Sequence, residues 1–241
     1  LYILGFDISI FYNKSWMDII KILPENISNQ IAAGEVIQRP ASVLKELVEN
    51  SIDADASFVQ IILKDSGKTL IKVIDDGIGM SKTDLRISFQ RHSTSKLNSS
   101  NDLFKIKTKG FRGEALSSIS SISEVEIHTN QSNHKLGNMI IIHGDKIQEE
   151  GVSSIEKGTS VNVKKIFYNV PARRNFLKSD NVELKKSIDE LHRLALAHPE
   201  IKFKFHHNKT ELFNLPSNNI KKRICSIFGN KINEFLLPIK E

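Results

Sequence analysis

LKELVENSIDADA, at residues 44–56, continues from Val43 as a segment with one apolar and one acidic stripe. Its apolar residues recur at helical spacing, which predicts a helix with one face toward a core. They are Val43, Leu44, Leu47, Val48 and Ile52. The opposite stripe carries Glu46, Glu49, Asn50 and Asp53. Taken alone, the polar stripe is explained by a solvated acidic helix face. The rest of the chain favours a functional face.

Length and composition bound the class of protein. A chain of 241 residues can build one substantial domain, or one domain and part of another. A hydrophobic content of 39% and a charged content of 26% are typical of a soluble globular protein. The sequence has no apolar run of ~18 residues, which excludes a membrane-spanning helix. The single cysteine, Cys225, excludes an internal disulfide and fits a reducing cytoplasm; its apolar helical surroundings predict a buried side chain.

The formal net charge of +6 permits binding to a polyanion such as DNA but does not establish it. Modest basic clusters occur at residues 172–174 and 221–223, and a solvated surface explains them equally well. The histidines show no metal-ligand spacing, so no protein-bound zinc site is expected.

The order of segments predicts how the chain is divided. Residues 1–16 precede Met17 and are expected to be an upstream extension outside the fold. Residues 17–216 form the expected main domain. Residues 217–241 are amphipathic but too short for a second core, so we expect them to open a truncated second domain.

Hydrophobic periodicity predicts an α+β sandwich. The expected helices lie at residues 27–36, 41–54, 82–91, 110–120 and 182–198, and the expected strands at 58–63, 70–75, 124–129, 138–143, 159–166 and 201–207. A turn is expected at 65–68 and a polar loop at 92–101. Strands as close as 58–63 and 70–75 form a hairpin, which argues against a doubly wound parallel sheet.

Four separated segments carry chemistry: Glu46 with Asn50, DDGIG at 75–79, TSK at 94–96 and GFRGEA at 110–115. Each has an ordinary alternative, such as a solvated face, a turn or a helix start that needs glycine. GFRGEA also lacks the Gly-Lys-Ser/Thr of a Walker A sequence. Read together, however, the four segments supply the parts of an ATP site.

The sequence offers complementary groups for the adenine base and for the phosphates of ATP. Asp75, at a predicted strand end, can accept a hydrogen bond from the adenine amino group, whereas guanine would present an oxygen there. Gly77 and Gly79 allow the backbone to approach the base. Gly110 and Gly113 expose amides at a helix start, which suits phosphate groups.

Three side chains complete the site. Lys96 can place a positive charge near the phosphate oxygens. Asn50 offers a neutral oxygen to Mg²⁺, with phosphates and waters filling the other positions. Glu46, one helical turn earlier, can polarise a water aimed at the γ-phosphate.

These segments resemble the ATPase superfamily shared by gyrase, a heat-shock chaperone, histidine kinases and MutL. Within it the chain closely resembles the MutL family of DNA mismatch-repair ATPases. The quoted matches are NQIAAGEVIQRPASVLKELVENSIDA (29–54), RHSTSK (91–96), GFRGEALSSIS (110–120) and NVPARRNFLK (169–178). The resemblance covers roughly residues 18–215, and NQIAAGEV and NVPARR separate it from the other branches.

The resemblance implies a fold and a set of roles. The fold is a two-layer sandwich of a mixed, mainly antiparallel sheet with helices on one face. Glu46 matches the general base, Asn50 the magnesium ligand, Asp75 the adenine-recognising aspartate and Thr159 a threonine that helps hold the base. Residues 94–96 match a lid, and residues 112–116 match the phosphate loop. The expected nucleotide contacts are Asn50, Asp75, Gly77, Gly79, Met80, Thr94, Ser95, Lys96, Gly110, Phe111, Arg112, Gly113, Glu114, Ala115, Leu116 and Thr159.

The implied activity is that of a slow, Mg²⁺-dependent ATPase switch of DNA mismatch repair. In the family, ATP drives dimerisation through the N-terminal region and hydrolysis resets it. The implied partners are DNA, bound weakly and without sequence preference, and a mismatch-recognition protein. A second domain of the family supplies a lysine to the γ-phosphate, so slow hydrolysis is expected from this chain alone.

Some positions depart from the family pattern. Many relatives have glycine where Asp55 stands and alanine where Ser93 stands. Asp76 replaces a commoner asparagine and adds an acid beside Asp75. The changes at Asp55 and Ser93 flank motifs and remove no named role.

Two other functions stay open at this point. One is the ATPase module of a type II topoisomerase, against which NVPARRNFL argues. The other is a non-enzymatic interaction module that keeps only the fold. Arg173 and Arg174 either buttress the site or form a surface contact with DNA.

Overall fold

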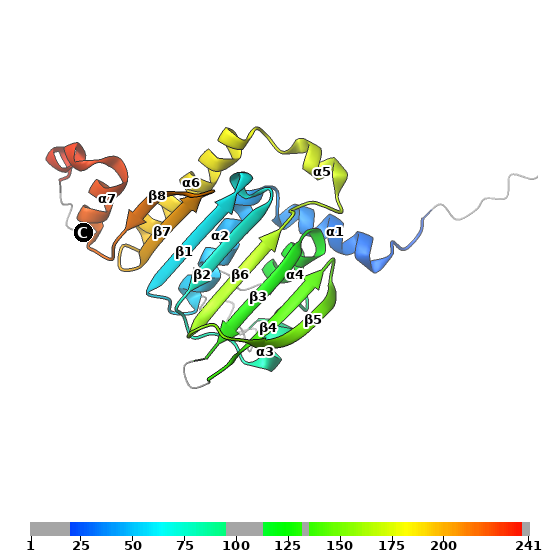
Figure 1. The fold of residues 1–241 in the computed structure, drawn as a ribbon. Coiled ribbons are helices and arrows are strands. Elements are labelled where there is room, and N and C mark those ends of the chain that lie inside the picture. Colours follow the sequence, from blue (N-terminus) through cyan, green and yellow to red (C-terminus); the bar gives the residue numbers. More distant parts are fainter. Residues whose placement is uncertain (1–19, 95–112, 132–134, 238–241) are drawn as a thin grey trace, which may run out of the picture.

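The computed structural model describes residues 20–94, 113–131 and 135–237. Within them, one eight-stranded sheet has the order β5-β4-β3-β6-β2-β1-β7-β8 (Figure 1). The strands are β1 (Phe58–Lys64), β2 (Leu70–Asp75), β3 (Glu124–Asn130), β4 (Gly137–His143), β5 (Lys146–Ser153), β6 (Gly158–Lys164), β7 (Lys202–His207) and β8 (Thr210–Leu215). The β1–β7 pair is parallel, and every other neighbouring pair is antiparallel.

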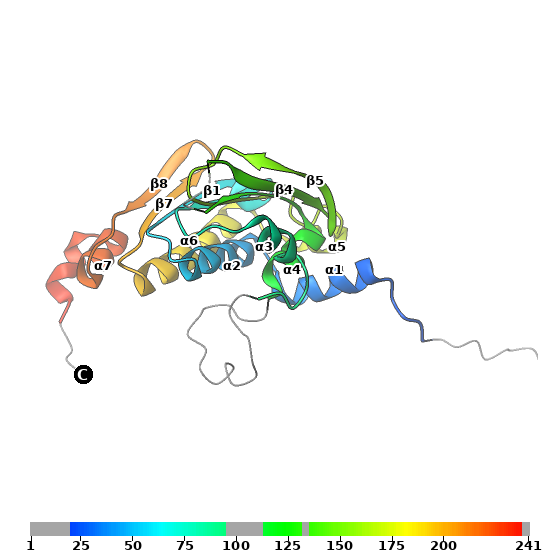
Figure 2. The same cartoon turned by 90° about the horizontal axis from the view of Figure 1, so that it is seen from below.

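The helices gather on one face of the sheet (Figure 2). They are α1 (Glu25–Val36), α2 (Pro40–Asp53), α3 (Lys82–Ile87), α4 (Ala115–Ile122), α5 (Pro171–Phe176), α6 (Asp180–Ala197) and α7 (Ile220–Phe228), with the short helices η2 (Asp65–Gly67) and η4 (Asn230–Phe235). The predicted two-layer sandwich with a mixed, mainly antiparallel sheet is therefore confirmed.

The core lies between the sheet and the helices, and α2, α4 and α6 all contribute buried apolar side chains to it. Along β1 the side chains of Val59, Ile61 and Leu63 are fully buried, and they alternate with the more exposed Gln60 and Ile62. This alternation is what a period of two gives a strand with one covered face. Of the apolar stripe predicted for α2, Val43, Leu44, Leu47 and Val48 are buried, and Ile52 is partly buried. Burial of that stripe directs the opposite, polar stripe away from the core.

Both ends of α2 have a local cause. Pro40 occupies the first turn, where its fixed φ suits a helix start. After the cap residue Ala54, Asp55 adopts a φ of +57°, in the left-handed region. That conformation costs an aspartate more than it would cost a glycine.

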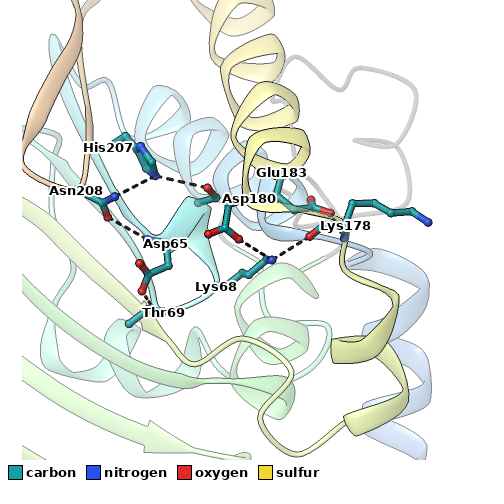
Figure 3. A network of polar contacts seen from close by, with 9 residues as sticks. Asp65, Lys68, Thr69, Lys178, Asp180, Glu183, His207 and Asn208 are labelled. Carbon is teal, nitrogen blue, oxygen red and sulfur yellow. Dashed lines mark hydrogen bonds and ion pairs between the residues drawn. The ribbon is translucent and has the colours of Figure 1, made fainter.

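A polar network holds the β1–β2 turn against two other elements (Figure 3). Lys68 Nζ lies 2.7 Å from Asp180 Oδ1 and donates to the carbonyl of Lys178 at 2.9 Å, which ties the turn to the start of α6. The amide of Asp65 donates to Asn208 Oδ1 at 3.1 Å, in the β7–β8 turn. The predicted turn is thus an anchoring point for the end of the sheet opposite Asp75.

The short helix η4, the strands β5 and β8 and the helix α5 were not predicted, and the helix predicted at 110–120 begins only at Ala115. β5 and β8 are edge strands with mostly exposed residues, so they lack the apolar alternation that marks a half-buried strand. α5 has only six residues and none of them is buried. The helix predicted at 82–91 ends at Ile87. Residues 1–16 lie outside the described residues, as do Ser95, Lys96, Gly110, Phe111 and Arg112.

The basic cluster at 221–223 is not a solvated surface throughout. Arg223 is fully buried, and its guanidinium donates to four carbonyl oxygens, at 2.7–3.2 Å. They belong to Ala195, Pro199, Ile201 and Pro216. Arg223 thereby attaches α7 to the end of α6 and the start of β7. Cys225, expected to be buried, is only partly so. The domain boundary after residue 216 stays a prediction.

Candidate nucleotide site

One pocket of about 940 Å³ opens between the helices and the sheet. It collects residues from α1, α2, α4, the loop after β2 and strand β6. The predicted site residues that line it are Glu46, Asn50, Asp75, Gly79, Met80, Thr94, Gly113, Glu114, Ala115, Leu116 and Thr159. Segments far apart in the sequence therefore converge on one cavity.

The helix α2 contributes the acidic wall. Glu46 and Asn50 are four residues apart, so they lie on the same helix face, and both line the pocket. The Glu46 side chain is 25% exposed, and its Oε1 lies 3.5 Å from Lys45 Nζ. That ammonium group makes a closer pair, at 2.9 Å, with Glu49 Oε2. Burial alone would lower the pKa of Lys45, but the two carboxylates raise it above its usual value. Sequence reasoning missed Lys45.

Asp75 is held on both of its carboxylate oxygens. It ends β2 opposite Thr159 of β6 and is only 8% exposed. Its Oδ1 accepts hydrogen bonds from the amides of Gly77 at 3.0 Å and Thr159 at 3.1 Å, and its Oδ2 accepts one from Ser51 Oγ at 2.7 Å. Burial raises the pKa of Asp75, and these three hydrogen bonds oppose that rise. The donors fix the orientation of the carboxylate.

Thr129 and Ser51 extend this network, and the sequence singled out neither. Thr129 Oγ1 accepts the amide of Met80 at 2.9 Å and lies 3.0 Å from Thr159 Oγ1. Ser51 donates to Asp75 from the helix α2. Hydroxyl residues in a strand or helix are common, so their sequence positions carry no signal of this role. Only the pairing of β3 with β6 brings Thr129 beside Thr159.

The structure gives the two glycines that were predicted to contact the base, Gly77 and Gly79, roles that do not depend on a nucleotide. Gly79 has a φ of +69°, and a Cβ there would lie 2.1 Å from the carbonyl oxygen of Asn130. Close approach of two backbone segments thus requires this glycine with or without a nucleotide. Gly77 does not line the pocket; its amide instead donates to Asp75.

Asp76 faces the start of β1. Its Oδ1 accepts the amides of Ser57 at 2.8 Å and Phe58 at 2.9 Å, and its Oδ2 accepts the Ser57 hydroxyl. Burial alone would raise the pKa of Asp76, but these hydrogen bonds lower it below the usual value. The additional acid therefore serves the strand and does not line the pocket.

Replacing Asp76 with alanine is expected to lower the free energy of unfolding at neutral pH by about 1 kcal/mol, because amides at the start of β1 lose their acceptor. A folded-state pKa below the unfolded value gives stability that is present above the unfolded pKa and lost as pH falls through the folded one. The alanine variant should consequently lose less stability than the unmutated protein on acidification below about pH 4. Urea unfolding at several pH values measures both effects, and parallel pH profiles would contradict this role.

Residues 113–116, which the sequence analysis expects to contact the phosphates, line the pocket at the start of α4. His92 Nδ1 lies 3.4 Å from Glu114 Oε1 and joins the segment after α3 to this helix start. A helix N-terminus with its unpaired amides suits phosphate oxygens.

The residues present fit a magnesium ion that is shared with a nucleotide. Within the described ranges, no group of three or more His, Cys, Asp or Glu side chains could enclose a metal ion. Mg²⁺ usually takes one or two protein oxygens and completes its octahedron with phosphates and waters. The amide oxygen of Asn50, in the pocket wall, is a suitable protein donor.

Comparison with known proteins first defines the class. The family model for histidine kinase-, DNA gyrase B- and HSP90-like ATPases matches residues 38–170. That span is more than half of the chain, which therefore belongs to this ATPase family.

The more similar relatives narrow the class to one branch. The DNA mismatch repair protein MutL of Christiangramia forsetii is 57% identical over 224 residues, which make up 93% of this chain and 36% of that protein. MutL of Flavobacterium psychrophilum is 58% identical over 223 residues, 92% of this chain and 36% of that protein. Within this class of ATPases, the chain belongs to the MutL family. It spans about a third of the length of these curated relatives.

A solved structure agrees with this assignment. The Aquifex aeolicus MutL ATPase domain, complexed with ADP, matches with a TM-score of 0.67 and 31% identity over 80% of this chain and 70% of that one. These similarities favour the mismatch-repair branch over a topoisomerase module. No helix in the described part of the chain is long and apolar enough to cross a membrane.

Proposed function

We propose that this chain is the Mg²⁺-dependent, ATP-binding switch of a cytoplasmic DNA mismatch-repair protein, and that it hydrolyses ATP slowly. The observation that carries the proposal is that Glu46, Asn50 and Asp75 line the same pocket. Membership of the MutL family supports the choice of ATP, as does the ADP bound to the related Aquifex domain.

Each residue has one task in the proposed mechanism. Asp75 accepts a hydrogen bond from the adenine amino group, and Thr159 supports the base beside it. The start of α4 presents amides to the phosphates. Glu46 accepts a proton from the attacking water, and Asn50 would hold Mg²⁺ through its amide oxygen. Bound Mg²⁺ would neutralise charge on the phosphate oxygens.

The switch itself is part of the proposal. ATP binding orders the pocket and promotes dimerisation through the N-terminal region, and hydrolysis reverses it. DNA is the expected polyanionic partner, bound without sequence preference, and a mismatch-recognition protein is the second partner. The type II topoisomerase alternative predicts instead that the chain supports DNA supercoiling together with a partner subunit.

Calorimetry with ATP, ADP and GTP, in the presence of Mg²⁺, tests the binding step. We expect the unmutated chain to bind both adenine nucleotides and to reject GTP, because Asp75 faces an oxygen on guanine. Failure to bind ATP would favour the non-enzymatic interaction module. Single-turnover hydrolysis tests the slow rate, and a rate equal to that of a full-length relative would refute it.

A further inference from the structure

The motif NVPARR at residues 169–174 lies outside the pocket, and two neighbouring arginines in it have different surroundings. Both belong to the short helix α5. Arg173 is half-buried and Arg174 is exposed. The two residues therefore offer a comparison of like charges at adjacent positions.

The guanidinium of Arg173 lies against the helix α1 at Gly34. A Cβ added to Gly34 would lie 2.4–2.6 Å from Nη2, Cζ and Nε of Arg173, closer than real Cβ atoms come to any neighbour. Gly34 is itself buried. The missing side chain of Gly34 thus creates a notch in α1 that the guanidinium fills, and Figures 1 and 2 both show α5 beside α1.

The same turn of α1 forms a wall of the nucleotide pocket. Ala32, Glu35 and Val36 line the pocket, and all three lie within two residues of Gly34. A helix moves largely as a rigid element, so a displacement at Gly34 shifts these wall residues with it. The notch and the pocket wall are therefore mechanically connected.

Electrostatics favours the same arrangement. The last turn of α1 contains no basic residue of its own, although helix C-termini carry partial negative charge. The guanidinium of Arg173 lies beside that turn and supplies a positive charge from another helix. Among the described residues, the Arg173 side chain makes no hydrogen bond or ion pair, so packing and this charge are what hold it.

We propose that Arg173 is a positioning residue for the nucleotide site: it fills the notch at Gly34 and fixes the α1 wall of the pocket. The inference rests on the proposed function, because it assigns to that pocket a support outside it. Arg174, exposed on the same helix, has no part in this support.

Calorimetric titration with ADP tests the proposal without requiring hydrolysis. Arg173→Ala is expected to weaken ADP binding about fivefold, the scale of coupling through a packed neighbour. Arg174→Ala is the matched control, with an affinity equal to that of the unmutated chain. Arg173→Lys keeps the charge and the aliphatic stem, and it should recover most of the lost affinity.

A double-mutant cycle makes the test specific to the notch. Gly34→Ala places a methyl group where the guanidinium lies, so the arginine must leave, while alanine favours the helix itself. We expect Gly34→Ala to weaken ADP binding by a similar factor. The double variant Gly34→Ala/Arg173→Ala should bind no more weakly than either single variant, because both remove one contact.

Three results would overturn the proposal. ADP affinity could be equal in the unmutated chain and in Arg173→Ala, or the two losses could multiply in the double variant. Arg173→Ala could also reduce DNA affinity and its salt dependence while ADP binding is unchanged, which would identify a DNA contact. Circular dichroism checks folding; if Arg173→Ala unfolds, Gly34→Ala and Arg173→Lys still decide. An unmutated, folded chain that binds no ADP would refute the proposed function itself.

Discussion

Replacing Glu46 with alanine or glutamine should lower the single-turnover rate of ATP hydrolysis by at least about 100-fold, the usual contribution of a general base. ATP affinity should change by less than about threefold, because the adenine and phosphate contacts stay in place. Glu46 is well placed for this role: it lines the pocket one helical turn before Asn50 and keeps a quarter of its side chain exposed.

Glu49 provides the sharpest comparison, since it is a second carboxylate of α2 that lines the same pocket. Its Oε2 pairs with Lys45 at 2.9 Å, whereas Glu46 Oε1 lies 3.5 Å from the same ammonium. The closer ion pair occupies a carboxylate oxygen of Glu49, so Glu49→Gln should reduce the rate less than Glu46→Gln. The reverse order would assign the base to Glu49, and unchanged hydrolysis in Glu46→Ala would remove Glu46 from the mechanism.

The elements that the sequence predicts well are those with a strong one-sided apolar pattern. The helix α2 and the hairpin of β1 and β2 are examples, because each buries one complete face. The sequence does not predict β5 and β8 because both are edge strands. An edge strand forms backbone hydrogen bonds with one neighbour only, and it needs little apolar surface. The burial of Arg223 was not predicted either, because the carbonyl groups that accept its hydrogen bonds come together only in the folded chain.

The candidate site divides in the same way. Asp75, Glu46 and Asn50 stand in segments whose residue types already suggest nucleotide chemistry, and the fold places them around one pocket. The residues that orient Asp75 are a serine from α2 and backbone amides after β2 and in β6. Backbone amides and a single serine give no recognisable sequence pattern, so the hydrogen bonds that orient Asp75 are found only in the structure.

Asp75→Asn is expected to lower ADP affinity by at least about 100-fold while the fold survives. The backbone amides of Gly77 and Thr159 require an acceptor at Oδ1, so the asparagine oxygen should occupy that position. Its amino group then replaces Oδ2 and meets the adenine amino group with a donor. Ser51 can adapt, because its hydroxyl can accept from that amino group and donate to the carbonyl of Leu47, 3.2 Å away. Calorimetry measures the loss.

Stability separates this effect from damage to the fold. Burial raises the folded-state pKa of Asp75, so its contribution to stability is largest below the unfolded pKa and is lost as pH rises through the folded one. At neutral pH the buried charge is a cost, and the uncharged asparagine should leave the melting temperature unchanged or higher.

Asp76→Asn is the matched control. It makes the same exchange one residue away, at a side chain hydrogen-bonded to Ser57 and Phe58, and it should retain full ADP affinity. Equal ADP affinity in Asp75→Asn and the unmutated protein would exclude Asp75 as the adenine acceptor, whereas a lower melting temperature would mean that its charge stabilises the fold.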